Sequence, residues 1–147
     1  MHKVEVLVIE DDGSDRFWLE YVLKMFDPNC SFSSVTDGRQ ALDFLLKRGP
    51  YSNAPDPDLI FLDIHLPILN GIEILRQVPN AHRLPICVLT GSDRESMLFQ
   101  QEFGIEGSNY LIKPISHESI LESSCCQSHL GIIGYLAPRG LATAPAQ

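Results

Sequence analysis

Short apolar runs alternate along the chain with longer stretches in which apolar residues recur at helical spacing. The short runs predict five strands, over residues 4–10, 30–36, 58–63, 85–90 and 108–114. Two of them, residues 4–10 and 58–63, are apolar at almost every position, which is typical of strands covered on both faces. The stretches between the strands predict helices over residues 14–26, 38–48, 70–78 and 93–103, and another that starts at Ser116. Strands interleaved with helices predict an α/β fold with one parallel sheet and right-handed crossovers.

Ser14 and Asp37 are the expected N-caps of the first two helices, because their side-chain oxygens can accept a hydrogen bond from the first turn. The first helix carries two sets of large apolar residues at helical spacing, Trp18, Val22 and Met25 and also Leu19, Leu23 and Phe26. The end of the chain is rich in Ala, Pro and Thr. We therefore expect one domain over residues 1–136 and a disordered tail over residues 137–147.

The chain has 147 residues and a net charge of -8, which argues against nonspecific binding to nucleic acid or to anionic membranes. No apolar run approaches the roughly 20 residues of a membrane span, and no signal peptide is visible. The four cysteines lack the spacing of a zinc or redox motif, and Cys87 is expected to be a core residue. Ordinary thiols and the missing signal peptide favour the cytoplasm.

Polar side chains gather where the predicted strands end. They are Glu10, Asp11 and Asp12 after the first strand, Asp63 at the third, Thr90 at the fourth and Lys113 at the fifth. Ligands of parallel open sheets bind at this carboxyl edge, so these side chains should share one site. Carboxylates alone would repel one another, and Mg²⁺, which prefers oxygen ligands, would relieve that repulsion. Lys113 and Thr90 would suit a phosphoryl group arriving at Asp63.

The motifs "VLVIEDD", "LIFLDIHLPILNG", "VLTGS" and "YLIKP" together resemble the signatures of the response-regulator receiver domain, the CheY-like family, over residues 3–122. The resemblance implies a flavodoxin-like fold: a five-stranded parallel sheet in the order 2-1-3-4-5, with helices on both faces. Residues 41–67, together with "LPICVLT", look most like the subgroup that partners bacterial and cyanobacterial phytochrome kinases.

The resemblance also implies a role for each site residue. Asp63 would be the phosphoacceptor, Asp11 a direct Mg²⁺ ligand, Glu10 a ligand through water, and the backbone carbonyl of His65 the third protein ligand. Thr90 and Lys113 would contact the phosphoryl group, Tyr110 would be the aromatic switch, and Lys113–Pro114 would be a cis peptide bond.

The implied function is that of a single-domain two-component response regulator. A sensor histidine kinase would phosphorylate Asp63 in a Mg²⁺-dependent reaction, and the protein would catalyse only its own phosphorylation and dephosphorylation. The face made by the fourth helix, the fifth strand and the fifth helix would then bind a target or a second copy. Its expected residues are Met97, Phe103, Tyr110 and Ile115. Exposed apolar residues on such a face mark a partner site.

Other interpretations remain open at this stage. The chain could be a pseudo-receiver that works as an interaction module without phosphorylation, or a hydrolytic or phosphotransferase enzyme with Asp63 as nucleophile. Against the enzyme, position 65 is a histidine and offers no general acid. Asp12 is either a third Mg²⁺ ligand or a loop or cap residue. Asp15 is expected to stabilise the N-terminus of the first helix. Tyr110 could be an ordinary core aromatic.

Overall fold

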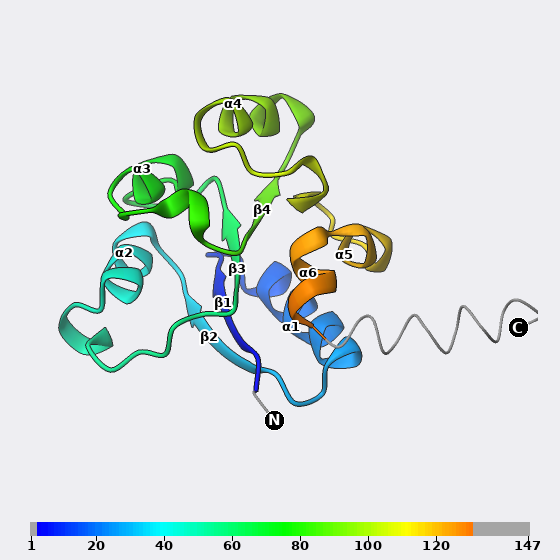
Figure 1. Cartoon of the computed structure of the whole chain (residues 1–147), viewed down its shortest axis with the longest axis horizontal. Coiled ribbons are helices and arrows are strands. Elements are labelled where there is room, and N and C mark those ends of the chain that lie inside the picture. The colour runs from blue at the N-terminus through cyan, green and yellow to red at the C-terminus, as the bar shows by residue number, and fades with distance from the viewer. Residues whose placement is uncertain (1–2, 131–147) are drawn as a thin grey trace, which may run out of the picture.

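A computed structural model describes residues 3–130 of the chain. Its centre is one sheet of five parallel strands in the order β2-β1-β3-β4-β5 (Figure 1). The strands are β1 (Glu5–Ile9), β2 (Ser31–Val35), β3 (Leu59–Asp63), β4 (Ile86–Thr90) and β5 (Tyr110–Ile112). The predicted fold class and strand order are confirmed. Every residue of β3 and β4 is buried, as expected for inner strands with a covered face on each side.

Within residues 3–130, six α-helices cover the two faces of the sheet (Figure 1). They are α1 (Gly13–Phe26), α2 (Gly38–Leu46), α3 (Gly71–Arg76), α4 (Asp93–Phe103), α5 (His117–Glu122) and α6 (Ser124–His129). Three short 3-10 helices lie at Gly49–Tyr51, Ala81–Arg83 and Gly107–Asn109. One apolar cluster packs α1, α5 and α6 on the sheet, and the other packs α2, α3 and α4 on the opposite face.

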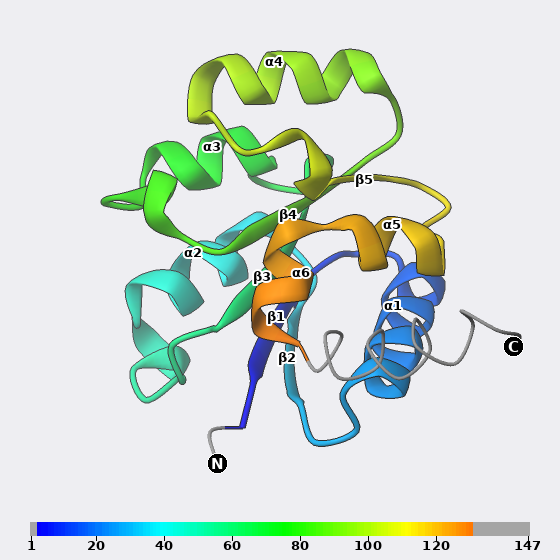
Figure 2. The same ribbon diagram turned by 45° about the vertical axis from the view of Figure 1, so that its right-hand side comes forward.

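The helix predicted from Ser116 is two helices, which are distinct in Figure 2. The break is at Ser123, which is fully buried and caps α6 by accepting a hydrogen bond from the Cys126 backbone N–H at 3.3 Å. The Ser123 hydroxyl donates to Asn109 Oδ1 at 2.6 Å, and this oxygen also accepts the backbone N–H of Cys125 at 3.1 Å. These tertiary hydrogen bonds end α5 and restart the chain as α6, which helical periodicity alone does not predict.

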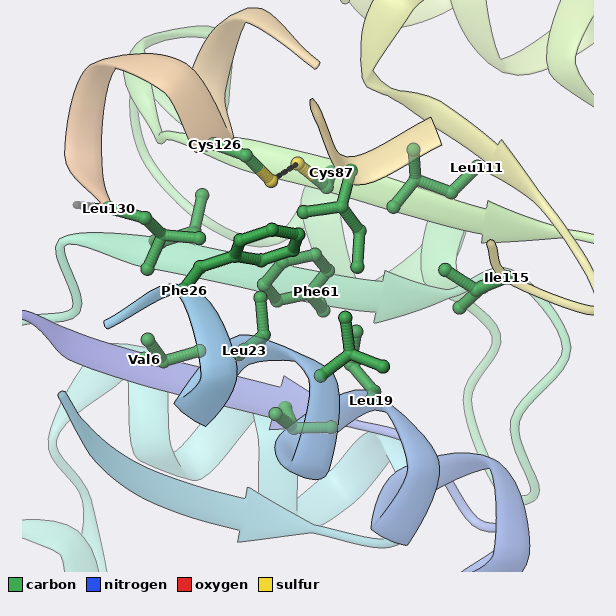
Figure 3. Packing of buried hydrophobic residues seen from close by; sticks show 14 of the residues in the cluster. Val6, Leu19, Leu23, Phe26, Phe61, Cys87, Leu111, Ile115, Cys126 and Leu130 are labelled. Carbon is green, nitrogen blue, oxygen red and sulfur yellow. Dashed lines mark hydrogen bonds between the residues drawn. The ribbon is translucent and has the colours of Figure 1, made fainter. Parts of the chain in front are cut away.

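The N-cap of α1 is Asp12 rather than the predicted Ser14, because the Asp12 carboxylate accepts the Asp15 backbone N–H at 2.9 Å. Asp37 caps α2 as predicted. In α1, Leu19, Leu23 and Phe26 pack toward Phe61 of the sheet (Figure 3). Of the other predicted set, only Val22 is buried, whereas Trp18 and Met25 are exposed.

Cys87 is a fully buried core residue, as predicted, and its Sγ lies 3.7 Å from Sγ of Cys126 (Figure 3). All four cysteines are free thiols. None of the helices within residues 3–130 is long and apolar enough to cross a membrane. The predicted domain boundary at residue 136 and the predicted disordered tail lie outside the described residues.

Candidate functional site

Three carboxylates meet at the carboxyl edge of the sheet. Strands β1 and β3 are neighbours, with Ile9 opposite Leu62, so the residues that follow Ile9 lie beside Asp63. One oxygen each from Glu10, Asp11 and Asp63 lies within 4.8 Å of the others. Glu10 and Asp63 are only 1% and 4% exposed, whereas Asp11 is open to solvent. Buried oxygens with one solvent-facing ligand fit a hard divalent cation that keeps some of its waters.

Lys113 supplies the positive charge at this edge. Its Nζ lies 2.6 Å from Oε1 of Glu10 and donates to Oδ2 of Asp63 at 3.0 Å. Burial acts to lower the pKa of Lys113, but hydrogen bonds to Glu10 and Asp63 outweigh it and raise that pKa above the usual range of lysine. The ammonium therefore stays charged and fixed next to the Asp63 carboxylate.

The single positive charge of Lys113 does not fully balance the negative charges of the carboxylates around it. The pKa of Glu10 is raised to about 7: burial raises it most, the hydrogen bond to Lys113 lowers it, and Asp63 also raises it. The Glu10 carboxylate is thus costly as an anion in the metal-free site. A divalent cation among Glu10, Asp11 and Asp63 would remove this cost, so the residues present fit a metal site.

The loop after Asp63 is held from two sides. Asp63 Oδ1 accepts the His65 backbone N–H at 3.0 Å, which leaves Oδ2 to Lys113. Gly71 packs against the strand end, where an added Cβ would lie 3.2 Å from the Asp63 backbone oxygen. On the other side, the backbone N–H of Gly38 donates to the Pro67 carbonyl at 3.1 Å. The backbone of His65, the predicted third metal ligand, lies within this fixed loop.

Thr90 and Tyr110 lie on one face of the sheet. Tyr110 pairs with Val88, two residues before Thr90, and side chains two apart on a strand point the same way. The buried Thr90 hydroxyl donates to the Ser92 carbonyl at 3.0 Å. The Tyr110 hydroxyl is buried without a hydrogen-bond partner among the described residues, and burial raises its pKa to about 12. The Tyr110 ring meets Phe99 of α4 edge-on, with centroids 6.3 Å apart.

Comparison with known proteins assigns the chain to a family. The model of the response regulator receiver domain matches residues 6–124. The chain belongs to this family. It therefore carries the signalling module of two-component response regulators, and the resemblance of its four motifs is confirmed.

The receiver domain is similar to several response regulators, among them regulators of bacterial and cyanobacterial phytochromes. It is 37% identical over 93 residues to the response regulator Rcp1 of Synechocystis. The aligned region covers 61% of this chain and 63% of Rcp1. The bacteriophytochrome response regulator AtBRR superposes with a TM-score of 0.74 at 26% identity, covering 90% of this chain and 95% of AtBRR.

Two further structures belong to the same group. The phosphorylated cyanobacterial phytochrome response regulator RcpA has a TM-score of 0.68 at 27% identity, covering 93% of this chain and 96% of RcpA. The Mn²⁺-bound form of Rcp1 has a TM-score of 0.66 at 29% identity, covering 90% of this chain and 94% of Rcp1. Proteins of similar sequence and fold are thus known in a phosphorylated and in a metal-bound form.

Four features of this receiver domain refine the sequence analysis. Lys113–Pro114 is a cis peptide bond, as the resemblance implies. Asp12 caps α1, which favours the cap interpretation, and the carboxylates that cluster are those of Glu10, Asp11 and Asp63. Ile115 is 6% exposed and therefore not part of an open apolar face, where the exposed residues are Met97 (61%) and Ile112 (42%).

The fourth feature is a contact that the sequence analysis missed. Oδ2 of Asp15 lies 3.2 Å from Lys113 Nζ, so this acid reaches the site from the first turn of α1. The sequence places Asp15 only five residues after Glu10, which indicates that it lies near the site. Whether its side chain reaches Lys113 depends on the orientation of α1.

Proposed function

We propose that this receiver domain accepts a phosphoryl group on Asp63 from a histidine kinase and thereby switches a partner-binding face. The observation that supports it best is the Asp63 carboxylate, buried at the end of β3, with the Lys113 ammonium 3.0 Å from one oxygen. A buried carboxylate facing a fixed ammonium, with two further acids beside it, suits the transfer of a phosphoryl group to Asp63.

The transfer forms one bond and breaks one. A carboxylate oxygen of Asp63 attacks the phosphorus of a phosphohistidine, and the phosphorus–nitrogen bond breaks with its electrons passing to the imidazole, which takes a proton from solvent. The product is an acyl phosphate with about two negative charges where the carboxylate had one. Lys113 and the Thr90 hydroxyl are the groups of this chain that would bind its oxygens. The protein thus catalyses only its own phosphorylation and dephosphorylation.

Mg²⁺ is the proposed metal, held by Asp11 and Asp63, by Glu10 through water and by the backbone carbonyl of His65. It would supply charge neutralisation at the phosphoryl oxygens. The all-oxygen donor set and the solvent-facing Asp11 suit Mg²⁺, which keeps several of its waters. The Mn²⁺-bound form of Rcp1 supports the binding of a divalent cation by this chain as well.

The switch runs through Thr90 and Tyr110. When the Thr90 hydroxyl turns toward the phosphoryl group, it gives up its hydrogen bond to the Ser92 carbonyl. Because Tyr110 lies on the same face and packs on Phe99 of α4, rearrangement at Thr90 would repack α4 against β5. We propose that the α4-β5-α5 face, on which Met97 and Ile112 are exposed, binds the target or a second copy of the chain.

The proposed kinase is of the phytochrome type, which the likeness to the phytochrome response regulators AtBRR and RcpA supports. The net charge of -8 supports a protein partner over nucleic acid or membrane, and cytoplasmic location is part of the same proposal. The alternative is an interaction module that works without phosphorylation.

The decisive experiment is incubation with acetyl phosphate and Mg²⁺, followed by intact-mass measurement. We expect the wild type to gain the mass of one phosphoryl group, and neither the Asp63→Asn variant nor the wild type with EDTA to gain it. Asp63→Asn keeps the shape of the side chain and removes the nucleophilic carboxylate, so it should remain folded. No mass gain in the wild type would favour the interaction module, and gain by Asp63→Asn would show that another residue is the acceptor.

A further inference from the structure

Lys113 is shared among three carboxylates rather than two. Its Nζ lies 2.6 Å from Glu10, 3.0 Å from Asp63 and 3.2 Å from Asp15. Glu10 and Asp63 follow neighbouring strands and are buried, whereas Asp15 comes from α1 and is half-exposed. Asp15 therefore approaches the ammonium from the solvent side. A lysine ammonium has three N–H donors, so these three acids can occupy all of them.

The position of Asp15 is set by the start of α1. Its backbone N–H donates to the Asp12 cap at 2.9 Å, which fixes the first turn of the helix. The next residue, Arg16, donates from its guanidinium to the Glu10 carbonyl at 2.9 Å and so ties that turn to the end of β1. The backbone at Asp15 is thus placed near Lys113 by two hydrogen bonds that do not involve Lys113.

We propose that Asp15 is a positioning residue that holds part of the Lys113 ammonium and so weakens the grip of Lys113 on a phosphoryl group at Asp63. This inference rests on the proposed function of Asp63. Phosphorylation adds negative charge at Asp63, and the ammonium is then divided between the phosphoryl oxygens and Asp15. Asp15 also places a negative charge within reach of those oxygens, which disfavours the phosphorylated state. Both effects shorten the life of the acyl phosphate.

The matched control is Asp12. Asp12→Asn and Asp15→Asn remove the same charge within one turn of the same helix, and asparagine remains a good N-cap at position 12. Of these two aspartates, Asp15 is the one whose carboxylate contacts Lys113. If only the negative charge near the start of α1 mattered, both variants would change the binding of a phosphoryl group alike. If the contact with Lys113 matters, only Asp15→Asn changes it. Asp15→Glu, which restores a carboxylate, tests for rescue.

The affinity for beryllium fluoride, a phosphoryl mimic, is measured at saturating Mg²⁺ together with the rate at which the phosphorylated domain loses its phosphoryl group. Half-exposed ion pairs have small effects, so we expect Asp15→Asn to bind the mimic about two- to fivefold more tightly and to lose the group more slowly by a similar factor. Asp12→Asn should match the wild type, and Asp15→Glu should return at least part of the way to it. Unchanged or weaker binding in Asp15→Asn, or equal gains in both Asn variants, would overturn the proposal.

A second readout does not depend on phosphorylation. The ¹⁵N signal of the Lys113 side chain should shift in Asp15→Asn and not in Asp12→Asn, and unfolding of each variant checks that the fold is intact. If the wild type neither accepts a phosphoryl group nor binds the mimic, the proposed function fails while this signal still tests the contact. If the wild type is phosphorylated normally and the Lys113 signal is the same in both variants, the role of Asp15 alone is wrong.

Discussion

At the scale of single residues, the buried carboxylates that form the site lower the stability of the fold. Glu10 and Asp63 are almost fully buried, and burying a charge costs several kcal/mol unless it is paired. The partner of both is the single ammonium of Lys113, which Asp15 also contacts. Burial is the main cause of the raised pKa of Glu10 and the neighbouring Asp63 adds to it, while the hydrogen bond to Lys113 lowers that pKa without cancelling the increase.

Glu10 makes the stability of the metal-free protein depend on pH. Burial raises its folded pKa to about 7 from an ordinary value of 4.5, so the folded state holds a proton that the unfolded state has lost between these values. Stability from this group is therefore complete below about pH 4.5 and is lost as pH rises through 7. The loss is on the order of 3 kcal/mol at most.

Urea unfolding in EDTA from pH 4.5 to 8 measures this effect, and the difference between wild type and Glu10→Gln isolates it from other groups. We expect the wild type to lose stability across that range relative to Glu10→Gln. Saturating Mg²⁺ should reduce the difference, because the metal binds the ionised carboxylate. Parallel curves for the two proteins in EDTA would mean that Glu10 titrates in its ordinary range.

The sequence predicts where the main site residues lie, because each is the last residue of a recognisable strand or follows it closely, and parallel strands bring their carboxyl ends together. These residues are Glu10, Asp11, Asp63, Thr90 and Lys113. Asp15 could not be predicted in this way. Its contact depends on the direction of α1, which is fixed by hydrogen bonds of Asp12 and Arg16 that leave no trace in hydrophobic periodicity.

At the scale of elements, periodicity predicted all five strands and the first four helices, and it was weakest where tertiary hydrogen bonds decide. Ser123 and Asn109 divide the last helix into α5 and α6, and the two helices still contribute Ile120 and Cys126 to one apolar cluster. A further regularity is that α1, α2 and α3 each begin with a glycine, at Gly13, Gly38 and Gly71. These three glycines do not have the same surroundings.

Gly38→Ala is expected to destabilise the domain, because an added Cβ would lie 2.0 Å from the backbone oxygen of Leu69. Either α2 or the loop that follows Asp63 must move, and such overpacking typically costs about 1–3 kcal/mol. Denaturant unfolding gives the free energy, and the same samples can be tested for phosphorylation, since the displaced loop carries His65.

Gly13→Ala is the matched control at the first residue of a helix. Its Cβ would meet only the Arg16 guanidinium at 3.7 Å, an ordinary contact. We expect no loss of stability, or a gain of up to about 1 kcal/mol from a stiffer unfolded chain. Equal losses in Gly13→Ala and Gly38→Ala would show that helix starts, and not the approach of Leu69, decide the effect.

At the scale of the whole molecule, the site is connected to a distant face through the ends of β4 and β5. Thr90 precedes the turn into α4, and Lys113 follows β5 directly. On its far side α4 is tied to α3 by a bidentate ion pair, with Arg76 Nη2 donating to Glu102 Oε1 at 2.7 Å. A phosphoryl group at Asp63 can therefore act on one end of α4 while its other end is restrained by α3.

A phosphoryl mimic should change this region more than the rest of the molecule. A modification shifts a two-state element only by its different interaction with the two states, and here the difference lies in the Thr90 and Lys113 contacts to the phosphoryl oxygens. Tyr110 is packed on Phe99 with its hydroxyl buried and without a partner among the described residues, so its repacking would be felt in α4. We expect beryllium fluoride with Mg²⁺ to alter amide hydrogen exchange mainly in residues 90–116.

Asp63→Asn serves as the control in that exchange experiment. Beryllium fluoride binds to the acceptor carboxylate, which this variant lacks, so adding it should leave the hydrogen exchange of Asp63→Asn unchanged. Exchange in α2, which lies on the same face as α4 and is hydrogen-bonded to the loop after Asp63 through Gly38, should change little. If protection changes are confined to residues 63–71, the phosphoryl group is bound but the route through Thr90 and Tyr110 does not carry the signal. Changes spread evenly over both faces of the sheet would instead indicate overall stabilisation by ligand binding, which raises the free energy of unfolding without selecting a surface.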